Sequence, residues 1–455
     1  MEAFITGIVA AVNDVLWNKQ LLLLFLLLGT GVFFTIRTRF VQVRKFGEGC
    51  RRLFGSFSLS GEKAGKEGMS SFQALTTAIA AQVGTGNITG CATALYSGGP
   101  GAIFWMWVSA FFGMSTIYGE AVLAQKYRTV DANGQVTGGP IYYIKAAFKG
   151  KLGSFMAGFF SIAIILALGF MGNMVQSNSI GSAFQTAFGV DPLIVGILVA
   201  LVAAFIFIGG VKRIASFTEK VVPVMALFYI AGCLIILVIN RAALLEAIRS
   251  IFVCAFNPKA VFGGALGLGV KEAMRFGVAR GLFSNEAGMG STPHAHAMAK
   301  VEKPQDQGVI AMMGVFIDTF IVLTLTALVI LTSGLLQPMA EGGLTATALA
   351  QAAFNQAFGS FGNIFIAICM LCFAFSTIIG WYFFGESNVN ALFKGSKKAK
   401  VIYAVIALCF IVVGSFQKVG LVWDMSDMFN GLMVIPNLLA VLALSGVVAA
   451  MAKED

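Results

Sequence analysis

The sequence predicts an all-α protein that crosses a membrane many times. Of its 455 residues, 58% are hydrophobic and only 11% are charged, and the mean hydropathy is +0.86. A soluble domain needs a polar surface around its core, so this composition excludes a soluble protein. Eleven apolar stretches long enough for membrane helices follow one another along the chain. Two of them are interrupted by glycines and polar residues, and these two interruptions organise the functional prediction.

The first apolar stretch has no small-residue cleavage signature, so we expect a retained helix and not a signal peptide. The net charge of +10 does not indicate nucleic-acid binding, because the basic residues lie in short loops between the expected spans. The eleven expected spans are residues 14–36, 70–97, 101–126, 153–180, 192–210, 219–239, 263–290, 308–334, 360–387, 399–415 and 428–451.

Loops on alternate sides of these spans differ in charge. Most of the 31 Lys and Arg residues fall on one side, and loops on the other side carry few. Basic loops stay in the cytoplasm during insertion. We therefore expect a multi-pass protein of the cell (inner) membrane, with its N-terminus outside and its C-terminus in the cytoplasm.

The first interruption is Ala-Ala-Gln-Val-Gly-Thr-Gly-Asn-Ile-Thr-Gly, residues 80–90. Each glycine weakens a helix by about 1 kcal/mol. Within hydrocarbon, a broken helix is tolerated only where its freed backbone groups are buried or line a cavity. The freed amides of Thr85 and Gly86 suit a carboxylate, and the freed carbonyls of Ala80 and Val83 suit a cation. The alternative is that the glycines only let two helices pack closely.

The second interruption lies in residues 276–293, five spans later, and combines glycines, a proline and a polar cluster. The two interrupted spans cross the membrane in opposite directions in the expected topology. Interruptions at matching positions of inverted halves are typical of a transporter binding site. We therefore expect an extra N-terminal helix with a basic cytoplasmic loop (residues 1–68), then two five-helix repeats (residues 69–240 and 241–455).

Three motifs resemble the alanine-or-glycine:cation symporter family of the amino acid–polyamine–cation superfamily. They are Gly-Thr-Gly-Asn-Ile at 84–88, Gly-Gly-Pro-Gly-Ala-Ile-Phe-Trp-Met-Trp at 98–107 and Gly-Val-Ala-Arg-Gly-Leu-Phe-Ser-Asn-Glu-Ala-Gly-Met-Gly at 277–290. The resemblance implies a LeuT-type fold with broken first and sixth core helices. It also implies sodium- or proton-coupled import of alanine or glycine by alternating access.

The resemblance further implies a sodium site between the first and eighth core helices. Hard cations prefer oxygen ligands, and the adjacent hydroxyls of Ser376 and Thr377 lie in mid-span. The alternative is that these hydroxyls only bond the preceding helical turn. The implied ligands are the carbonyls of Ala80, Val83 and Phe373 with the hydroxyls of Ser376 and Thr377.

A zwitterionic substrate needs a different partner at each end. Its carboxylate suits the amides of Thr85 and Gly86 at the positive end of a half-helix. Its ammonium suits side-chain oxygens, and bulky aromatic walls would favour a small side chain. The ammonium candidates are Gln82, Asn87, Gln176, Ser284 and Asn285, and the wall candidates are Phe283 and Trp381.

Other polar residues within the spans need a reason, because an unpaired charge in hydrocarbon is costly. We expect Glu286 to bond freed amides of the second interruption, whereas Glu120, Asp318 and Glu386 have no assigned place. His294 and His296 lie two residues apart and share no helix face, which argues against a metal site.

The sequence therefore predicts a sodium-coupled symporter, with an amino acid, sodium and the lipid bilayer as its partners and no organic cofactor. It predicts no enzyme, because no phosphate loop, nucleophile triad or metal cluster occurs. One alternative is proton coupling, in which Lys220 at the start of the sixth span would replace the sodium. Another is a channel or membrane scaffold with packing glycines.

Overall fold

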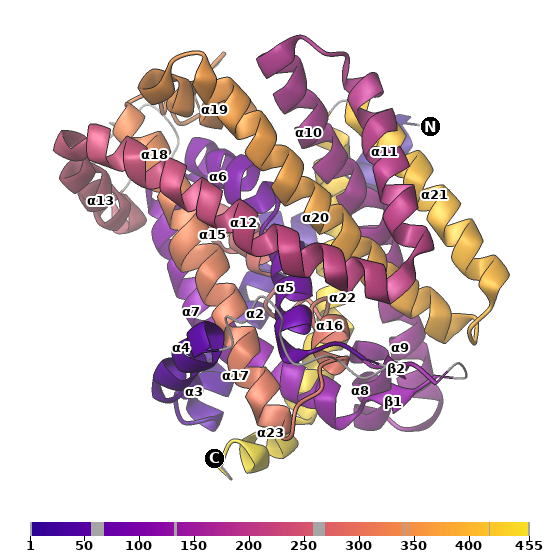
Figure 1. Cartoon of the computed structure of the whole chain (residues 1–455). Coiled ribbons are helices and arrows are strands. Elements are labelled where there is room, and N and C mark those ends of the chain that lie inside the picture. The colour runs from indigo at the N-terminus through magenta and orange to yellow at the C-terminus, as the bar shows by residue number, and fades with distance from the viewer. Residues whose placement is uncertain are drawn as a thin grey trace.

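The computed structural model describes residues 2–55, 68–131, 134–257, 269–339, 342–344, 346–417 and 419–453. Within these residues the protein is a bundle of helices, and Figure 1 places the two termini at opposite ends of it. One antiparallel pair of strands, β1 (Thr129–Val130) and β2 (Val136–Thr137), lies in a loop at the end of the bundle.

Each expected span corresponds to helix. The continuous ones are α7 (Gly101–Lys126), α11 (Pro192–Ile208), α12 (Gly210–Ile239), α20 (Phe361–Leu392), α21 (Lys397–Phe416) and α22 (Val419–Ala443). Three others contain a π-helical segment: α1, η1 and α2 (Glu2–Asn13, Asp14–Asn18, Leu22–Arg37); α9, η3 and α10 (Gly150–Ile164, Ile165–Gly172, Asn173–Phe188); and α17, η5 and α18 (Pro304–Val315, Phe316–Leu323, Thr324–Ser333).

The two remaining spans are broken, as predicted. The first consists of α5 (Ser71–Gln82), η2 (Gly86–Gly90) and α6 (Cys91–Gly98), and the second of α15 (Val270–Asn285) and α16 (Pro293–Ala297). Eight helices are long and apolar enough to cross a membrane; α11, which is shorter, and the two broken spans bring the number in the described residues to eleven. Residues 263–268, the predicted start of the seventh span, lie outside the described residues.

Local sequence explains where the broken helices begin and end. The Ser70 hydroxyl and the Gln73 side chain form a reciprocal capping box that starts α5. The second helix, α15, ends at Glu286, which adopts the left-handed conformation (φ 58°). An added Cβ at Gly380 of α20 would lie 3.1 Å from the Ala81 Cβ, so α20 and α5 touch directly.

The structure differs from the prediction outside these spans. The first span begins with α1 at Glu2 and not at residue 14. The last span begins at residue 419 and not at 428, and a separate short helix, α23 (Ser445–Met451), follows α22. Among the described residues, five further helices were not predicted because they are too short or too polar to resemble spans. They are α3 (Val41–Arg44), α4 (Phe46–Gly55), α8 (Pro140–Ala147), α13 (Arg241–Phe256) and α19 (Ala346–Phe358). The repeat boundaries at residues 69 and 241 stay a prediction.

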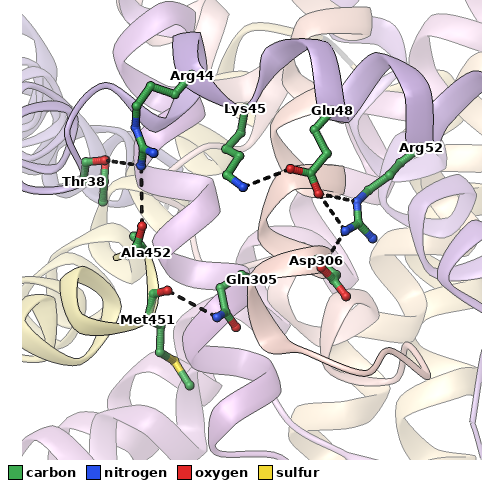
Figure 2. A network of polar contacts seen from close by, with 9 residues as sticks. All are labelled: Thr38, Arg44, Lys45, Glu48, Arg52, Gln305, Asp306, Met451 and Ala452. Atoms are coloured by element: carbon green, nitrogen blue, oxygen red, sulfur yellow. Dashed lines mark hydrogen bonds and ion pairs between the residues drawn. The ribbon is translucent and has the colours of Figure 1, made fainter. Parts of the chain in front are cut away.

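A polar network joins α4 to α17, and both α3 and α17 to the C-terminal end of α23 (Figure 2). Glu48 accepts hydrogen bonds from Lys45 (3.0 Å) and Arg52 (2.7 Å), and Arg52 also pairs with Asp306 of α17 (2.8 Å). Arg44 donates to the Ala452 carbonyl (3.5 Å). The short helix α4 is therefore held against the start of the eighth span.

Candidate functional site

The first break lies at residues 83–85. Val83 leaves the α5 helix (φ −81°, ψ 89°), so the amides that follow lose their helical acceptors. The Gly84 amide instead donates to Asn87 Oδ1 (2.9 Å), and the Thr85 amide donates to Gln176 Oε1 of α10 (3.1 Å). Side-chain oxygens therefore satisfy both freed amides.

This arrangement refines the prediction for two residues. Gln176 lies at the break, but its carbonyl oxygen accepts from the same Thr85 amide that the sequence assigned to a substrate carboxylate. The Thr85 amide has a single hydrogen to donate. A substrate carboxylate must therefore displace the Gln176 oxygen in order to bind this amide. The expected role of Gln176 toward the ammonium group stays a prediction.

The two breaks meet at Asp318, a buried acid of η5 that the sequence did not place. Its Oδ1 accepts from Asn87 Nδ2 of the first break (2.7 Å) and from Ser284 Oγ of the second (2.9 Å). Thr319 donates to the other carboxylate oxygen (2.8 Å). The available signal was an acid within an apolar span, which is rare unless it has a function.

Close contact between the breaks requires glycine at position 86. A Cβ added to Gly86 would lie 2.9 Å from the Ser284 Cα and 3.0 Å from its hydroxyl. Asn285 donates to Thr319 (3.2 Å), and Gln82 donates to the Asn285 carbonyl (2.8 Å). These contacts bring six of the predicted substrate residues together at one junction between the two breaks. They are Gln82, Thr85, Gly86, Asn87, Ser284 and Asn285.

The oxygens implied for sodium lie between α5 and α20. Thr377 Oγ donates to the carbonyls of Ala80 (2.9 Å) and Phe373 (3.0 Å). Ser376 Oγ donates to the same two carbonyls, at 3.4 and 2.9 Å. The bonds to Phe373 lie within α20, as expected if the hydroxyls only bond the preceding turn of their own helix. The bonds to Ala80 instead connect α20 to the broken helix α5.

This donor set fits a hard cation, because it consists of neutral oxygens on fully buried residues. Val83, the fifth implied ligand, is the residue at which α5 ends. Gly84 backs onto the site, since a Cβ there would lie 3.1 Å from the Thr377 Cβ. The candidate cation site and the candidate substrate junction therefore share the first break.

Aromatic side chains flank the second break. The rings of Phe283 and Trp381 pack edge to face with centroids 5.5 Å apart, and both residues are buried. Phe283 also contacts Trp423 of α22 (4.9 Å), which the sequence did not single out. The Arg280 guanidinium lies over the Trp423 ring (4.8 Å) and pairs with Asp427. The aromatic wall thus extends into the eleventh span.

The freed amides of the second break bond an acid other than the predicted one. Gly288 and Gly290 adopt positive φ angles (89° and 78°) and donate to the two carboxylate oxygens of Glu120 on α7, each at 3.0 Å. Glu286 instead accepts from Ser291 Oγ (2.5 Å) and from the Trp381 indole. The two glycine amides therefore point toward α7 and not toward Glu286, which is closer to them in the sequence.

The structure also shows the surroundings of the two histidines and of Lys220. His294 bonds Asn388 (2.8 Å) and His296 bonds Gln307 (2.8 Å), so the two rings face different neighbours. Lys220 is exposed on α12, whereas Met225 of the same helix places its sulfur 3.6 Å from Ser376 Oγ. Met225, and not Lys220, is therefore the residue of α12 with a defined contact to the candidate cation ligands.

Comparisons with known proteins agree with this arrangement. A family model described as the sodium:alanine symporter family matches residues 1–454. The sodium/alanine symporter AgcS of Methanococcus maripaludis is 42% identical over 98% of this chain and 96% of its own length. The probable sodium/glutamine symporter GlnT of Bacillus subtilis is 43% identical, over 100% of this chain and 91% of its own.

Two solved structures share the fold at low sequence identity. MhsT in complex with L-phenylalanine is 15% identical with a TM-score of 0.59, over 86% of this chain and 99% of that one. A Na⁺-coupled sialic acid symporter in an outward-open state is 14% identical with a TM-score of 0.55, over 92% and 85%. These likenesses confirm the predicted LeuT-type fold.

Proposed function

The chain belongs to the sodium:alanine symporter family, and from this premise we propose that it imports alanine or glycine together with sodium. The family and the structural neighbours are membrane transporters, and no enzymatic family is indicated. In this proposal the N-terminus lies outside and the C-terminus in the cytoplasm. Sodium and substrate bind at the breaks, and access alternates as one set of helices moves against the other.

The observation that carries the proposal is the contact of α20 with the first break. Thr377 Oγ reaches the Ala80 carbonyl, three residues before the Val83 turn and five before the Thr85 amide. A sodium ion among these oxygens would hold α5 against α20 and fix the shape of the break. The same break offers its amides to the substrate, so each ligand raises the affinity for the other.

The surroundings of the junction favour a small substrate. Gly86 packs so closely against Ser284 that a Cβ on Gly86 would not fit, and the packed rings of Phe283 and Trp381 close one side of the junction. The carboxylate would take the Thr85 amide from Gln176, which costs one hydrogen bond and releases the Gln176 side chain. That side chain can then turn its oxygen toward the ammonium group. Alanine and glycine satisfy this geometry with the least displacement.

Proton coupling is the second candidate, and the observation in its favour is Asp318 rather than Lys220. Asp318 is a buried carboxyl group in contact with both breaks, so its protonation would alter the junction directly. Lys220 is exposed, and Met225 lies nearer to the cation site. An all-oxygen donor set at Thr377 favours sodium over a proton.

The test is uptake of labelled alanine, glycine and glutamine into proteoliposomes, under an imposed sodium gradient or an imposed proton gradient. We expect accumulation of alanine or glycine above the external concentration only with inward sodium. Accumulation that follows the proton gradient and ignores sodium would select the second candidate. Equilibration without accumulation under either gradient would identify a channel, and glutamine uptake alone would overturn the assigned substrate.

A further inference from the structure

An apolar groove lies beside the first broken helix. It encloses about 230 Å³, and its walls come from α4, α5, α12 and the eighth span. Leu75 and Ile79 of α5 and Val222 and Ala226 of α12 are among the residues that line it. Thr76 is the only polar residue among the described residues that line it. For comparison, an apolar cavity of about 150 Å³ holds a benzene molecule.

The sequence of α12 accounts for this space. Pro223 lies inside the helix and in the groove wall. Proline has no amide hydrogen for the carbonyl four residues earlier, and its ring forces the helix away from that carbonyl. Ala226, at the next turn, is too small to fill the gap that remains. The groove is therefore built into the helix and does not depend on one side-chain rotamer.

The opposite wall is held in place by the polar network of Figure 2. Cys50 and Leu53 of α4 line the groove; Cys50 lies between the network residues Glu48 and Arg52 in the sequence, and Leu53 directly follows Arg52. Arg52 bonds Glu48 (2.7 Å) within α4 and Asp306 (2.8 Å) at the start of α17. Because these ion pairs fasten α4 to α17, the side chains of α4 cannot simply move into the space.

The size of the groove distinguishes between the two occupants that a membrane offers. Along α12 the lining runs from Val222 to Ile230, about 12 Å at 1.5 Å per residue. A groove wide enough for a helix of that length and about 10 Å in diameter would offer about 490 Å³ to the centre of a water molecule, about twice the 230 Å³ present. An unbranched hydrocarbon chain is narrow enough to enter. We propose that one acyl chain of a membrane phospholipid occupies this groove.

Basic residues on the helices that line the groove indicate the headgroup. Lys220 is exposed one turn before the lining residue Pro223, on the same face of α12, and Arg51 is exposed on α4. Both belong to the loops that the charge pattern places in the cytoplasm, where the leaflet carries anionic lipids. We therefore assign the occupant as an anionic phospholipid, represented experimentally by phosphatidylglycerol. Its chain would contact Ile79, the residue directly before Ala80, so it braces the broken helix beside the cation site.

Lipid binding can be measured without transport, so it tests this inference independently of the proposed function. Purified protein is stripped of lipid in detergent and titrated with phosphatidylglycerol or phosphatidylcholine, and bound lipid is counted by native mass spectrometry. Ala226→Phe fills the groove, and Ala231→Phe places the same ring at an exposed position of α12 outside it. Ala226→Leu is a milder variant in case the larger one does not fold.

We expect one phosphatidylglycerol per wild-type chain and about a tenfold weaker affinity in Ala226→Phe, with Ala226→Leu between them and Ala231→Phe unchanged. Lys220→Gln should reduce the preference for phosphatidylglycerol over phosphatidylcholine, and Lys212→Gln, exposed on the same helix, should not. Equal lipid binding by wild type and both Ala226 variants would overturn the proposal. The proposal would also be overturned if the wild type forms a dimer that Ala226→Phe loses while lipid binding is retained. The groove would then face a second copy of the chain.

Discussion

Replacing Thr377 by alanine tests the contact on which sodium coupling depends. The Thr377 hydroxyl bonds the Ala80 carbonyl across helices (2.9 Å) and the Phe373 carbonyl within α20 (3.0 Å). Loss of a neutral hydrogen bond costs about 0.5–1.5 kcal/mol of stability, whereas an interaction with a charged partner is worth about 1.5–3 kcal/mol. At about 1.4 kcal/mol per tenfold change, the sodium affinity should fall about 10- to 150-fold, while the fold loses little.

The assay is a titration of alanine binding over a range of sodium concentrations at fixed pH. We expect the sodium concentration at half-maximal substrate binding to rise by that factor in Thr377→Ala, and the substrate affinity to return at saturating sodium, because the coupling is reciprocal. Ser387→Ala is the matched control, since Ser387 bonds only the Phe383 carbonyl of its own helix (2.9 Å) among the described contacts. Coincident curves for wild type and Thr377→Ala would refute the assigned cation site.

Four other variants follow from the same geometry. Gly86→Leu should abolish substrate binding in folded protein, because its Cβ would overlap Ser284; unchanged affinity by equilibrium binding would contradict this. Phe283→Ala should let leucine and methionine compete better against alanine, by about 1–3 kcal/mol, as measured by competition in the same assay. Asp318→Asn should lower substrate affinity more than the unfolding temperature, because it keeps the shape but replaces an acceptor of three hydrogen bonds; equal losses would indicate a purely structural role. Burial raises the pKa of Glu48, but hydrogen bonds from Arg52 and Lys45 outweigh this effect, so the pKa lies below the ordinary value for a glutamate. The ionised Glu48 therefore stabilises the folded protein at neutral pH. This stabilisation is lost as the pH falls through the lowered pKa. Glu48→Gln should therefore flatten the decline of the unfolding temperature on acidification, and an unchanged decline would show that the α4 network contributes no stability.

The sequence alone predicts the spans and the two breaks, because both depend on properties of a local stretch. Hydrocarbon demands about 20 apolar residues per helix, and α7 begins and ends at the predicted residues. Glycines at 84 and 86 break a helix wherever it packs. The hydroxyls of Ser376 and Thr377 lie close together because the two residues are adjacent in the sequence, although their match to Ala80 came from the family resemblance. The predicted last span began too late because polar residues such as Asp424 and Asp427 lower the local hydropathy.

Only the tertiary structure decides which partner each freed or charged group finds. The Thr85 amide bonds Gln176, 91 residues away, and Asp318 joins breaks that lie 231 and 34 residues before it. Glu120 and not Glu286 takes the amides of Gly288 and Gly290, because positive φ angles turn those amides toward α7. A buried polar group must be satisfied by whichever group the packing brings within about 3 Å. Hydropathy and spacing carry no information about that distance, so the sequence could indicate that these residues need partners but not which partners they have.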